Sequence, residues 1–335
     1  MAQDISSAEF AAAIAAVESD AASAGEKAEM LMEIAVGMQS RPKSTGQLHR
    51  AVVLYERALE LCPRESPLLR ARITARMGTA LQRLPDGSSD SLYRAQSCFE
   101  TALSVLRDGG RPEEVAEVEM NLGLVLQSLA GAGQAKIQDA IQYYHRALRV
   151  FTREAYPQEF AILHNNIAIA YLSLPVTDER ARMREALAVQ SFEEVLKVIN
   201  IVDHPSEYAM VQNNLGNALQ YVSSSHVVEN NLRALQAYDE ALKVRNARDT
   251  PLEYANTLAN KANVLRNLPD DPECPESGQR VNLLEATRMY EEAKKIFARF
   301  HQTDSAAALG EALDELAEAF RPYASANTND AAGLV

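Results

Sequence analysis

Residues 205–244 decide the fold. They read Pro205-Ser-Glu-Tyr-Ala-Met-Val-Gln-Asn-Asn-Leu-Gly-Asn-Ala-Leu-Gln-Tyr221 and, after a polar gap, Ala234-Leu-Gln-Ala-Tyr-Asp-Glu-Ala-Leu-Lys-Val244. The second segment places Ala234, Tyr238 and Ala241 on the apolar stripe of a helix that faces a partner. Gly216, in the middle of the first segment, costs roughly 1 kcal/mol in helix propensity relative to alanine. We therefore interpret Gly216 as a contact point where a neighbouring helix leaves no room for a larger side chain.

This pair of segments recurs along the chain. The small residue of the first segment appears at intervals of 43–48 residues, as Ala35, Gly78, Gly123, Ala168, Gly216 and Ala262. The second segment repeats an alanine, an aromatic residue four later and a small residue three after that, with the aromatic residue at Tyr55, Phe99, Tyr144, Phe192, Tyr238 and Tyr290. Five first segments begin with a proline eleven residues before the small residue, at Pro67, Pro112, Pro157, Pro205 and Pro251. Proline suits the first helical position, because its missing N–H would be unpaired there.

The pattern of Leu215-Gly216-x2-Leu219 followed by Ala234-x3-Tyr238-x2-Ala241 resembles the tetratricopeptide repeat (TPR) family. The family's usual unit is 34 residues, and the excess here lies between the two helices. The segments Asn-Asn-Leu-Gly (213–216) and Asn-Asn-Ile-Ala (165–168) most resemble the long-repeat bacterial and kinesin-light-chain types. The resemblance implies an all-α fold: an α-solenoid (a right-handed superhelix) of about six to seven TPR-like helix pairs with terminal capping helices.

The expected organisation has three parts. Residues 1–24 form an N-terminal capping helix, with Phe10, Ile14 and Val17 on its apolar face. Residues 25–320 form the TPR solenoid, whose segment 304–320 resembles a lone first helix. Residues 321–335 form a flexible C-terminal tail. A membrane-surface role for the N-terminal helix would require Lys or Arg on its polar face, and it has none.

Composition excludes several classes of protein. The 335 residues carry 33 Lys and Arg against 46 Asp and Glu, a net charge of −13, which argues against nucleic-acid binding. No stretch of 18 apolar residues and no signal-peptide core is present, so we expect no membrane partner. Cys62, Cys98 and Cys274 are odd in number and form no CxxC motif. These features predict a reduced, cytoplasmic protein, in a bacterial cytosol.

No catalytic motif is recognisable in the sequence. His145 and His164 lie on predicted helices and could approach one another, but a surface and a core histidine are the simpler interpretation, which we favour. Asp270, Asp271 and Glu273 lack the glycine and the spacing of a calcium loop. We therefore predict that the protein is not an enzyme and holds neither cofactor nor metal.

In TPR folds the first helices line a concave groove. The lining positions lie two and three residues before the small residue, and one, four and five after it. In this sequence they give the predicted partner-binding groove: Arg76, Arg83, Asn121, Asn165, Asn166, Asn213, Asn214, Asn217, Gln220, Asn260, Asn263 and Arg266. A carboxamide offers donors and an acceptor, which suits the backbone of an extended peptide.

Two alternatives stay open for these residues. The asparagines could instead hydrogen-bond between adjacent first helices, and the arginines could pair with neighbouring glutamates. The carboxylate clamp by which some TPR domains bind chaperone tails is absent. Its lysine positions here hold Ala75, Met120, Asn165, Asn213 and Ala259.

The sequence thus predicts a non-enzymatic scaffold that binds a partner protein or extended peptide in its Asn- and Arg-lined groove, as adaptor, assembly factor or regulator. One alternative is a structural protein that associates with itself, as a homo-oligomer, through the groove or the inter-helix loops. Another is an accessory factor of a multi-subunit metalloenzyme, such as a nickel–iron hydrogenase, although no motif carries that link. Fold alone does not define a function.

Overall fold

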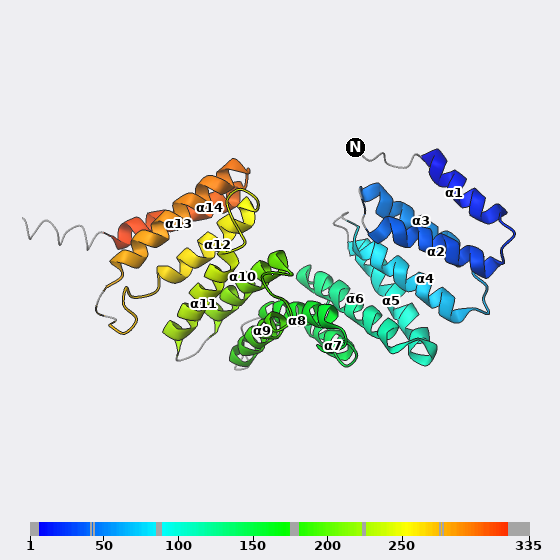
Figure 1. The fold of residues 1–335 in the computed structure, drawn as a ribbon, viewed down its shortest axis with the longest axis horizontal. Helices are drawn as coiled ribbons and strands as arrows, with labels where there is room; N and C mark the ends of the chain where they lie inside the picture. The colour runs from blue at the N-terminus through cyan, green and yellow to red at the C-terminus, as the bar shows by residue number, and fades with distance from the viewer. Residues whose placement is uncertain are drawn as a thin grey trace, which may run out of the picture. The chain divides into compact units, whose positions relative to one another are not determined.

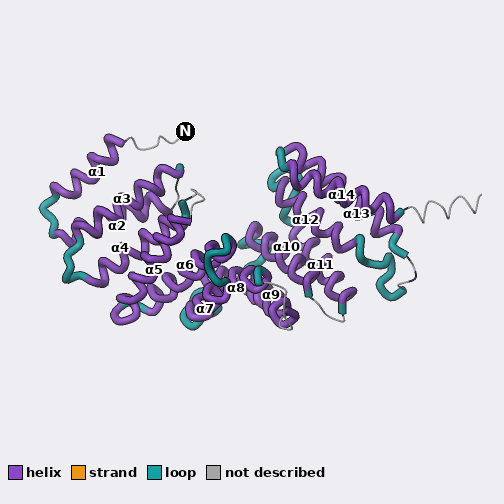
Figure 2. The backbone as a smooth tube through the Cα atoms, turned by 180° about the vertical axis from the view of Figure 1, so that it is seen from behind, coloured by secondary structure: helices purple, strands orange, loops and turns teal. Residues whose placement is uncertain are grey.

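The computed structural model describes residues 7–40, 42, 44–84, 89–174, 181–222, 226–274, 276 and 278–320. Within them the regular elements are fourteen α-helices joined by loops (Figure 2), with one isolated β-bridge between Asp271 and Cys274. The chain divides into two compact units, Met1–Ser173 and Leu174–Val335. Residues 321–335, expected to form a tail, and residues 1–6 lie outside the described part.

The first unit contains eight helices (Figure 1). Their bounds are α1 Ser7–Ser19, α2 Ala24–Ser40, α3 Thr45–Leu61, α4 Pro67–Gln82, α5 Ser89–Gly109, α6 Pro112–Gly131, α7 Ile137–Ala147 and α8 Pro157–Leu172. Helices α2 and α3, α4 and α5, and α6 and α7 form packed pairs. Each second helix of these pairs also packs against the first helix that follows it, so the pairs stack in chain order.

The second unit contains the remaining six helices. Their bounds are α9 Ala181–Leu196, α10 Pro205–Tyr221, α11 Val227–Leu242, α12 Pro251–Leu265, α13 Arg280–Arg299 and α14 Thr303–Ala319. Helix α9 packs on α10, α10 and α11 form a pair, and so do α12 and α13. Helix α14 packs on α13. This is the solenoid arrangement that the sequence predicts: all-α, and built from helix pairs.

The prolines of the repeat begin helices, and its glycines make close contacts, as the sequence predicts. Helices α4, α6, α8, α10 and α12 each begin at their proline. A Cβ built on Gly123 would lie 2.5 Å from a ring carbon of Tyr144, and one on Gly216 would lie 2.6 Å from the ring of Tyr238. The small residue therefore admits the aromatic side chain of the second helix, which is fully buried in both pairs. This contact sets the close approach of the two helices.

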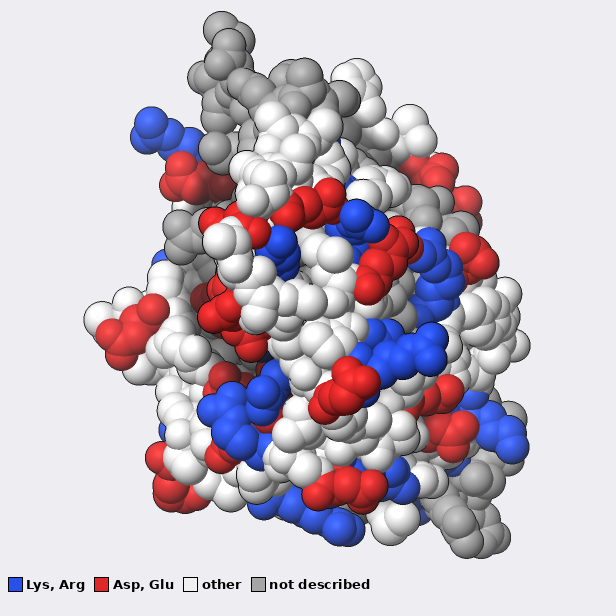
Figure 3. Space-filling model, turned by 90° about the vertical axis from the view of Figure 1, so that its right-hand side faces the viewer, with Lys and Arg blue, Asp and Glu red and all other residues white. Residues whose placement is uncertain are grey.

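The N-terminal helix α1 falls within the segment expected to cap the solenoid, and its capping role stays a prediction. Among the helices of the described residues, none combines the length and the apolar character needed to cross a bilayer. On the face drawn in Figure 3, basic and acidic side chains lie next to one another rather than in separate fields.

Candidate partner-binding surfaces

The residues two positions before each small residue share one place on the first helices. From the second repeat to the sixth they are Arg76, Asn121 and Asn166 in the first unit, and Asn214 and Asn260 in the second unit. Asn166 is buried, Arg76 is exposed, and the other three are half-buried. A side chain must reach the surface to meet a partner, so this position offers four candidate contacts and one core asparagine.

A small cleft opens on the first unit between α4 and α6. Arg76, Thr79 and Asn121 line its walls, and Phe99 and Leu106 of α5 form its apolar floor. Its cavity volume is about 40 Å³, and since one water needs about 10–15 Å³, it holds roughly three waters. That size fits the end of one side chain rather than a metabolite.

Ion pairs join the two walls of this cleft. Arg72 Nε lies 2.7 Å from Glu114 Oε1, and Arg76 Nη1 lies 2.7 Å from Glu117 Oε1. The hydrogen bond from Arg72 holds the pKa of Glu114 below its usual value. Arg72 and Arg76 of α4 thus bind glutamates of the next first helix, the pairing with neighbouring glutamates that the sequence left open.

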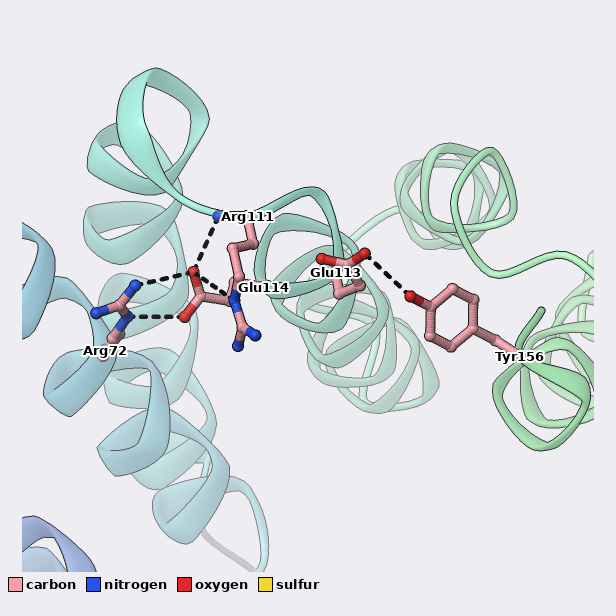
Figure 4. Close-up of polar contacts among 5 residues, drawn as sticks. All are labelled: Arg72, Arg111, Glu113, Glu114 and Tyr156. Carbon is pink, nitrogen blue, oxygen red and sulfur yellow. Dashed lines mark hydrogen bonds and ion pairs between the residues drawn. The ribbon is translucent and has the colours of Figure 1, made fainter.

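The same carboxylate also caps helix α6. Glu114 Oε2 accepts a hydrogen bond of 2.9 Å from the backbone N–H of Arg111, while its neighbour Glu113 accepts one of 3.0 Å from the hydroxyl of Tyr156 (Figure 4). Tyr156 directly precedes α8. The N-terminal turn of α6 is therefore tied to α4 on one side and to the start of α8 on the other, which fixes the spacing of three first helices.

Arg83 lies apart from the cleft. Its Nη1 donates a hydrogen bond of 2.8 Å to the backbone carbonyl of Gln39 at the end of α2. It is the C-cap residue of α4. In this position Arg83 joins two adjacent first helices and satisfies a carbonyl that the end of a helix leaves unpaired.

Several predicted groove residues hold the tyrosines of their own repeat. Asn217 Oδ1 accepts a hydrogen bond of 2.7 Å from the Tyr238 hydroxyl, to which Gln220 also donates. Asn263 accepts a hydrogen bond from the Tyr290 hydroxyl. In the first unit Gln39 and Gln127 accept from Tyr55 and Tyr144, both at 2.7 Å.

These acceptors follow a rule that the sequence already contains. They lie one or four residues after the small residue, and buried tyrosine hydroxyls require such partners. In the fourth repeat the aromatic residue is Phe192, and the same positions are Ile169 and Leu172. The second repeat, which also has a phenylalanine (Phe99), keeps polar residues there, Thr79 and Gln82. A polar side chain is therefore present in every repeat whose tyrosine hydroxyl needs one, but not only there. Gln39 was missed as a tyrosine acceptor, although this register would have identified it.

Replacement of Gln127 by methionine tests the rule. The Tyr144 hydroxyl, on a ring that is 0% exposed, would lose its acceptor, and the free energy of unfolding should fall by about 1–3 kcal/mol. The double variant Gln127→Met, Tyr144→Phe removes both partners and should recover most of that loss. Urea denaturation measures both. A double variant as unstable as the single one would refute the hydrogen bond as the reason for the glutamine.

Four other asparagines of the predicted groove form hydrogen-bonded pairs. Asn260 Nδ2 donates to Asn213 Oδ1 at 3.4 Å, between α12 and α10. Asn165 Nδ2 donates to Asn166 Oδ1 at 3.5 Å, and the second polar atom of each carboxamide, Asn165 Oδ1 and Asn166 Nδ2, is buried without a hydrogen-bond partner among the described residues. Arg266 forms an ion pair of 2.8 Å with Glu315 of α14.

Asn121 and Asn214 differ from the rest of the predicted set. They occupy the same repeat position, they are half-buried, and within the described part of the chain the structure records no hydrogen bond from either carboxamide. Asn121 also lines the cleft of the first unit. Among the described residues, these two are the members of the predicted groove whose side chains make no hydrogen bond or ion pair.

Catalytic chemistry finds little support among the described residues. No group of three or more His, Cys, Asp or Glu is arranged there to hold a metal ion. Burial raises the pKa of the Cys98 thiol to about 11, so the thiol is protonated at neutral pH. His145 lies 3.4 Å from the Tyr171 hydroxyl, whereas His164 stacks on Phe160 at 4.3 Å between ring centroids.

Comparison with known proteins identifies the fold. No protein-family model matches the chain, and no curated protein does. BtubC (BKLC) from P. vanneervenii is similar in structure, with 21% identity, a TM-score of 0.51 and coverage of 71% of this chain and 89% of that chain. A STAND signal-transduction ATPase with a TPR sensor from Pyrococcus horikoshii is 16% identical, with a TM-score of 0.54 over 90% of this chain and 42% of that one. The assembly chaperone of RpL4 (Acl4) is 16% identical, with a TM-score of 0.51 over 89% and 99%.

These likenesses, together with the repeated helix pairs, define the class: the chain has the fold of the tetratricopeptide-repeat proteins, an all-α helical-repeat solenoid.

Proposed function

We propose that this protein is a non-enzymatic interaction scaffold that binds a partner protein or an extended peptide on the faces formed by its first helices. The observation that carries the proposal is the pair Asn121 and Asn214, one in each unit, whose carboxamides occupy one repeat position and make no hydrogen bond with the described residues. Polar groups placed at one register without a partner in the fold suit a ligand with a repeating backbone.

The cleft beside Asn121 supports the proposal. It offers an apolar floor, a carboxamide and two arginine–glutamate pairs within the space of one side-chain end. A peptide side chain that enters it would lie over the buried ring of Phe99, while the adjacent backbone meets Asn121. Since both arginines are already paired, the cleft favours a neutral or mixed-charge ligand over a purely acidic one.

The fold is compatible with this role. Among the solved structures that share it, one is the assembly chaperone of RpL4 and another carries a TPR sensor. In this role the protein would act in the cytoplasm as an adaptor, an assembly factor or a regulator.

Affinity capture tests the proposal. The baits are the wild-type protein, the double variant Asn121→Leu, Asn214→Leu, and a control, Gln142→Leu, Gln236→Leu, that makes the same chemical change at exposed positions of the second helices α7 and α11. We expect a partner, identified by mass spectrometry, that wild type and control retain and the double variant loses. Equal recovery by all three baits would place the binding site elsewhere and overturn the proposal.

A further inference from the structure

The helices at the two ends of the described chain carry complementary halves of a repeat. Phe10 of α1 lies 45 residues before Tyr55 and has Ala13 three residues after it, as in a second helix, although Ser6 replaces the alanine of the pattern. Gly310 of α14 lies 48 residues after Ala262 and is flanked by Leu309 and Leu313, which is the pattern of a first helix. Helix α1 therefore has the sequence of a second helix, and α14 that of a first helix.

The aromatic residue of α1 is less buried than its counterparts. The six aromatic residues of the internal second helices are each 0% exposed: Tyr55, Phe99, Tyr144, Phe192, Tyr238 and Tyr290. Phe10 is half-buried, with the guanidinium of Arg50 5.8 Å from its ring centroid. Its ring thus retains apolar surface that every internal repeat covers.

The glycine of α14 shows the converse. A Cβ at Gly78, Gly123 or Gly216 would strike the ring of the following second helix at 2.9, 2.5 or 2.6 Å. At Gly310 the nearest atom is instead the flexible end of Lys294, with its Nζ at 3.1 Å. Gly310 has the residue type of an aromatic-receiving site, and no aromatic ring lies on it among the described residues.

The face of α14 around Gly310 is less buried than the matching face of α12. In α12 the face that packs on α13 is buried and consists of Leu258, Ala259, Ala262 and Leu265. The residues 48 positions later on α14 are Ala306, Ala307, Gly310 and Leu313. Ala307 is exposed, and the other three are half-buried. The small, apolar character of the face is kept. Ala306 and Leu313 pack against the core cluster of α12 and α13, and no second helix follows α14 in the described chain to cover the rest of the face.

We propose that α1 of one molecule docks on this face of α14 of a second molecule and completes a seventh helix pair. Internal second helices such as α5 pack on the first helices before and after them. In its own chain α1 packs on α2, the first helix that follows it. Docking would use the other face of α1, so its packing on α2 need not break, although the side chains of Arg50 beside Phe10 and of Lys294 beside Gly310 would have to move. The new interface continues the stacking of α12, α13 and α14.

Charge register supports a second copy as the occupant. Three ion pairs join consecutive second helices. If each residue is numbered from the aromatic residue of its own helix, the two positions of every pair differ by six. The pairs are Glu18–Arg57 at 2.5 Å, Glu56–Arg94 at 3.0 Å and Glu193–Arg233 at 2.6 Å. The same offset, applied from α13 to a docked α1, places Lys295, five residues after Tyr290, opposite Glu9, one residue before Phe10. The residue types at these two positions, lysine and glutamate, carry opposite charges.

This contact joins unlike surfaces, so it would extend head to tail into open chains rather than close as a symmetric dimer. The mode of association is independent of the proposed partner-binding faces, because it uses α1 and α14 rather than the positions of Asn121 and Asn214. It also differs from self-association through the groove or the inter-helix loops.

Two variants that each block one end provide the test. Phe10→Ala removes the aromatic side chain of α1, and Gly310→Leu fills its site on α14, where the flexible Lys294 can give way. By analytical ultracentrifugation from micromolar to millimolar concentration, wild type should grow past the mass of a dimer. Each variant alone should remain monomeric. A mixture of the two should form a 1:1 dimer, because α1 of the Gly310→Leu variant can dock on α14 of the Phe10→Ala variant. Nothing larger should form, because both outer ends of this dimer are blocked.

Control variants separate this interface from other effects. Ala308→Leu, at an exposed position of the same helix, should associate like wild type. Lys295→Glu should weaken association about two- to fivefold, as for an exposed ion pair, and Glu9→Lys in the same chain should restore it. A monomeric wild type at all concentrations would overturn the proposal. So would a dimer that both blocking variants still form, or association that appears only after truncation at Phe320, which would identify residues 321–335 as the occupant.

Discussion

Replacement of Gly123 by leucine should lower the free energy of unfolding by about 3 kcal/mol, at the upper end of the usual cost of overpacking a core. Even the Cβ of the new side chain would lie 2.5 Å from the Tyr144 ring, which is fully buried and has no room to withdraw. The leucine would therefore push α6 and α7 apart. Because neighbouring repeats stabilise one another, we expect the loss to spread to the adjoining helices.

Gly37 provides the matched control for this prediction. It also lies in a first helix, but it is exposed, and nothing lies within 4 Å of a Cβ built there. Gly37→Ala should therefore stabilise the protein by up to about 1 kcal/mol through helix propensity alone. Thermal unfolding monitored by circular dichroism measures both the expected loss of stability in Gly123→Leu and the expected gain in Gly37→Ala. A Gly123→Leu protein that melts at the wild-type temperature would contradict the close contact on which the fold depends.

Single replacements of Asn121 or Asn214 by leucine should each weaken partner binding by about 5- to 150-fold. The partner group that bonds the carboxamide would be left buried and unpaired, which costs about 1–3 kcal/mol. Thermal stability should hardly change, because neither side chain holds another part of the described structure. Titration calorimetry with the captured partner measures the affinity.

Asn217→Leu supplies the contrast. Its carboxamide accepts the hydrogen bond of the buried Tyr238 hydroxyl, so this variant should lose stability. If Asn217→Leu reduced affinity without loss of stability, while Asn121→Leu left affinity intact, the assignment of the two asparagines would be reversed.

Most of the fold could be predicted because it is local. Repeated spacings define each helix pair, and the start of five first helices follows from a single proline whose φ angle suits a helical first turn. The close contacts at Gly123 and Gly216 follow from the cost of glycine within a helix. Stacking then needs only the same contact repeated.

The candidate site was less predictable, because each carboxamide has more than one possible partner. Asn217 and Asn214 lie three residues apart on α10 and look alike in sequence, yet Asn217 bonds to Tyr238. A tyrosine at the aromatic position of the repeat indicates that a carboxamide one or four residues after the small residue serves as its acceptor, as Asn217 does for Tyr238. Arg76 pairs with Glu117, 41 residues further along the chain. This separation is close to the repeat interval of 43–48 residues, so the two side chains meet only when neighbouring first helices stack.

Amide hydrogen exchange of the protein with and without its captured partner tests the central claim most directly, because it reports which helices the partner protects. Our account predicts new protection on the first helices that carry the unoccupied asparagines, α6 around Asn121 and α10 around Asn214, and little change on the outer faces of α7 and α11. Protection confined to the second helices or to the inter-helix loops would contradict it.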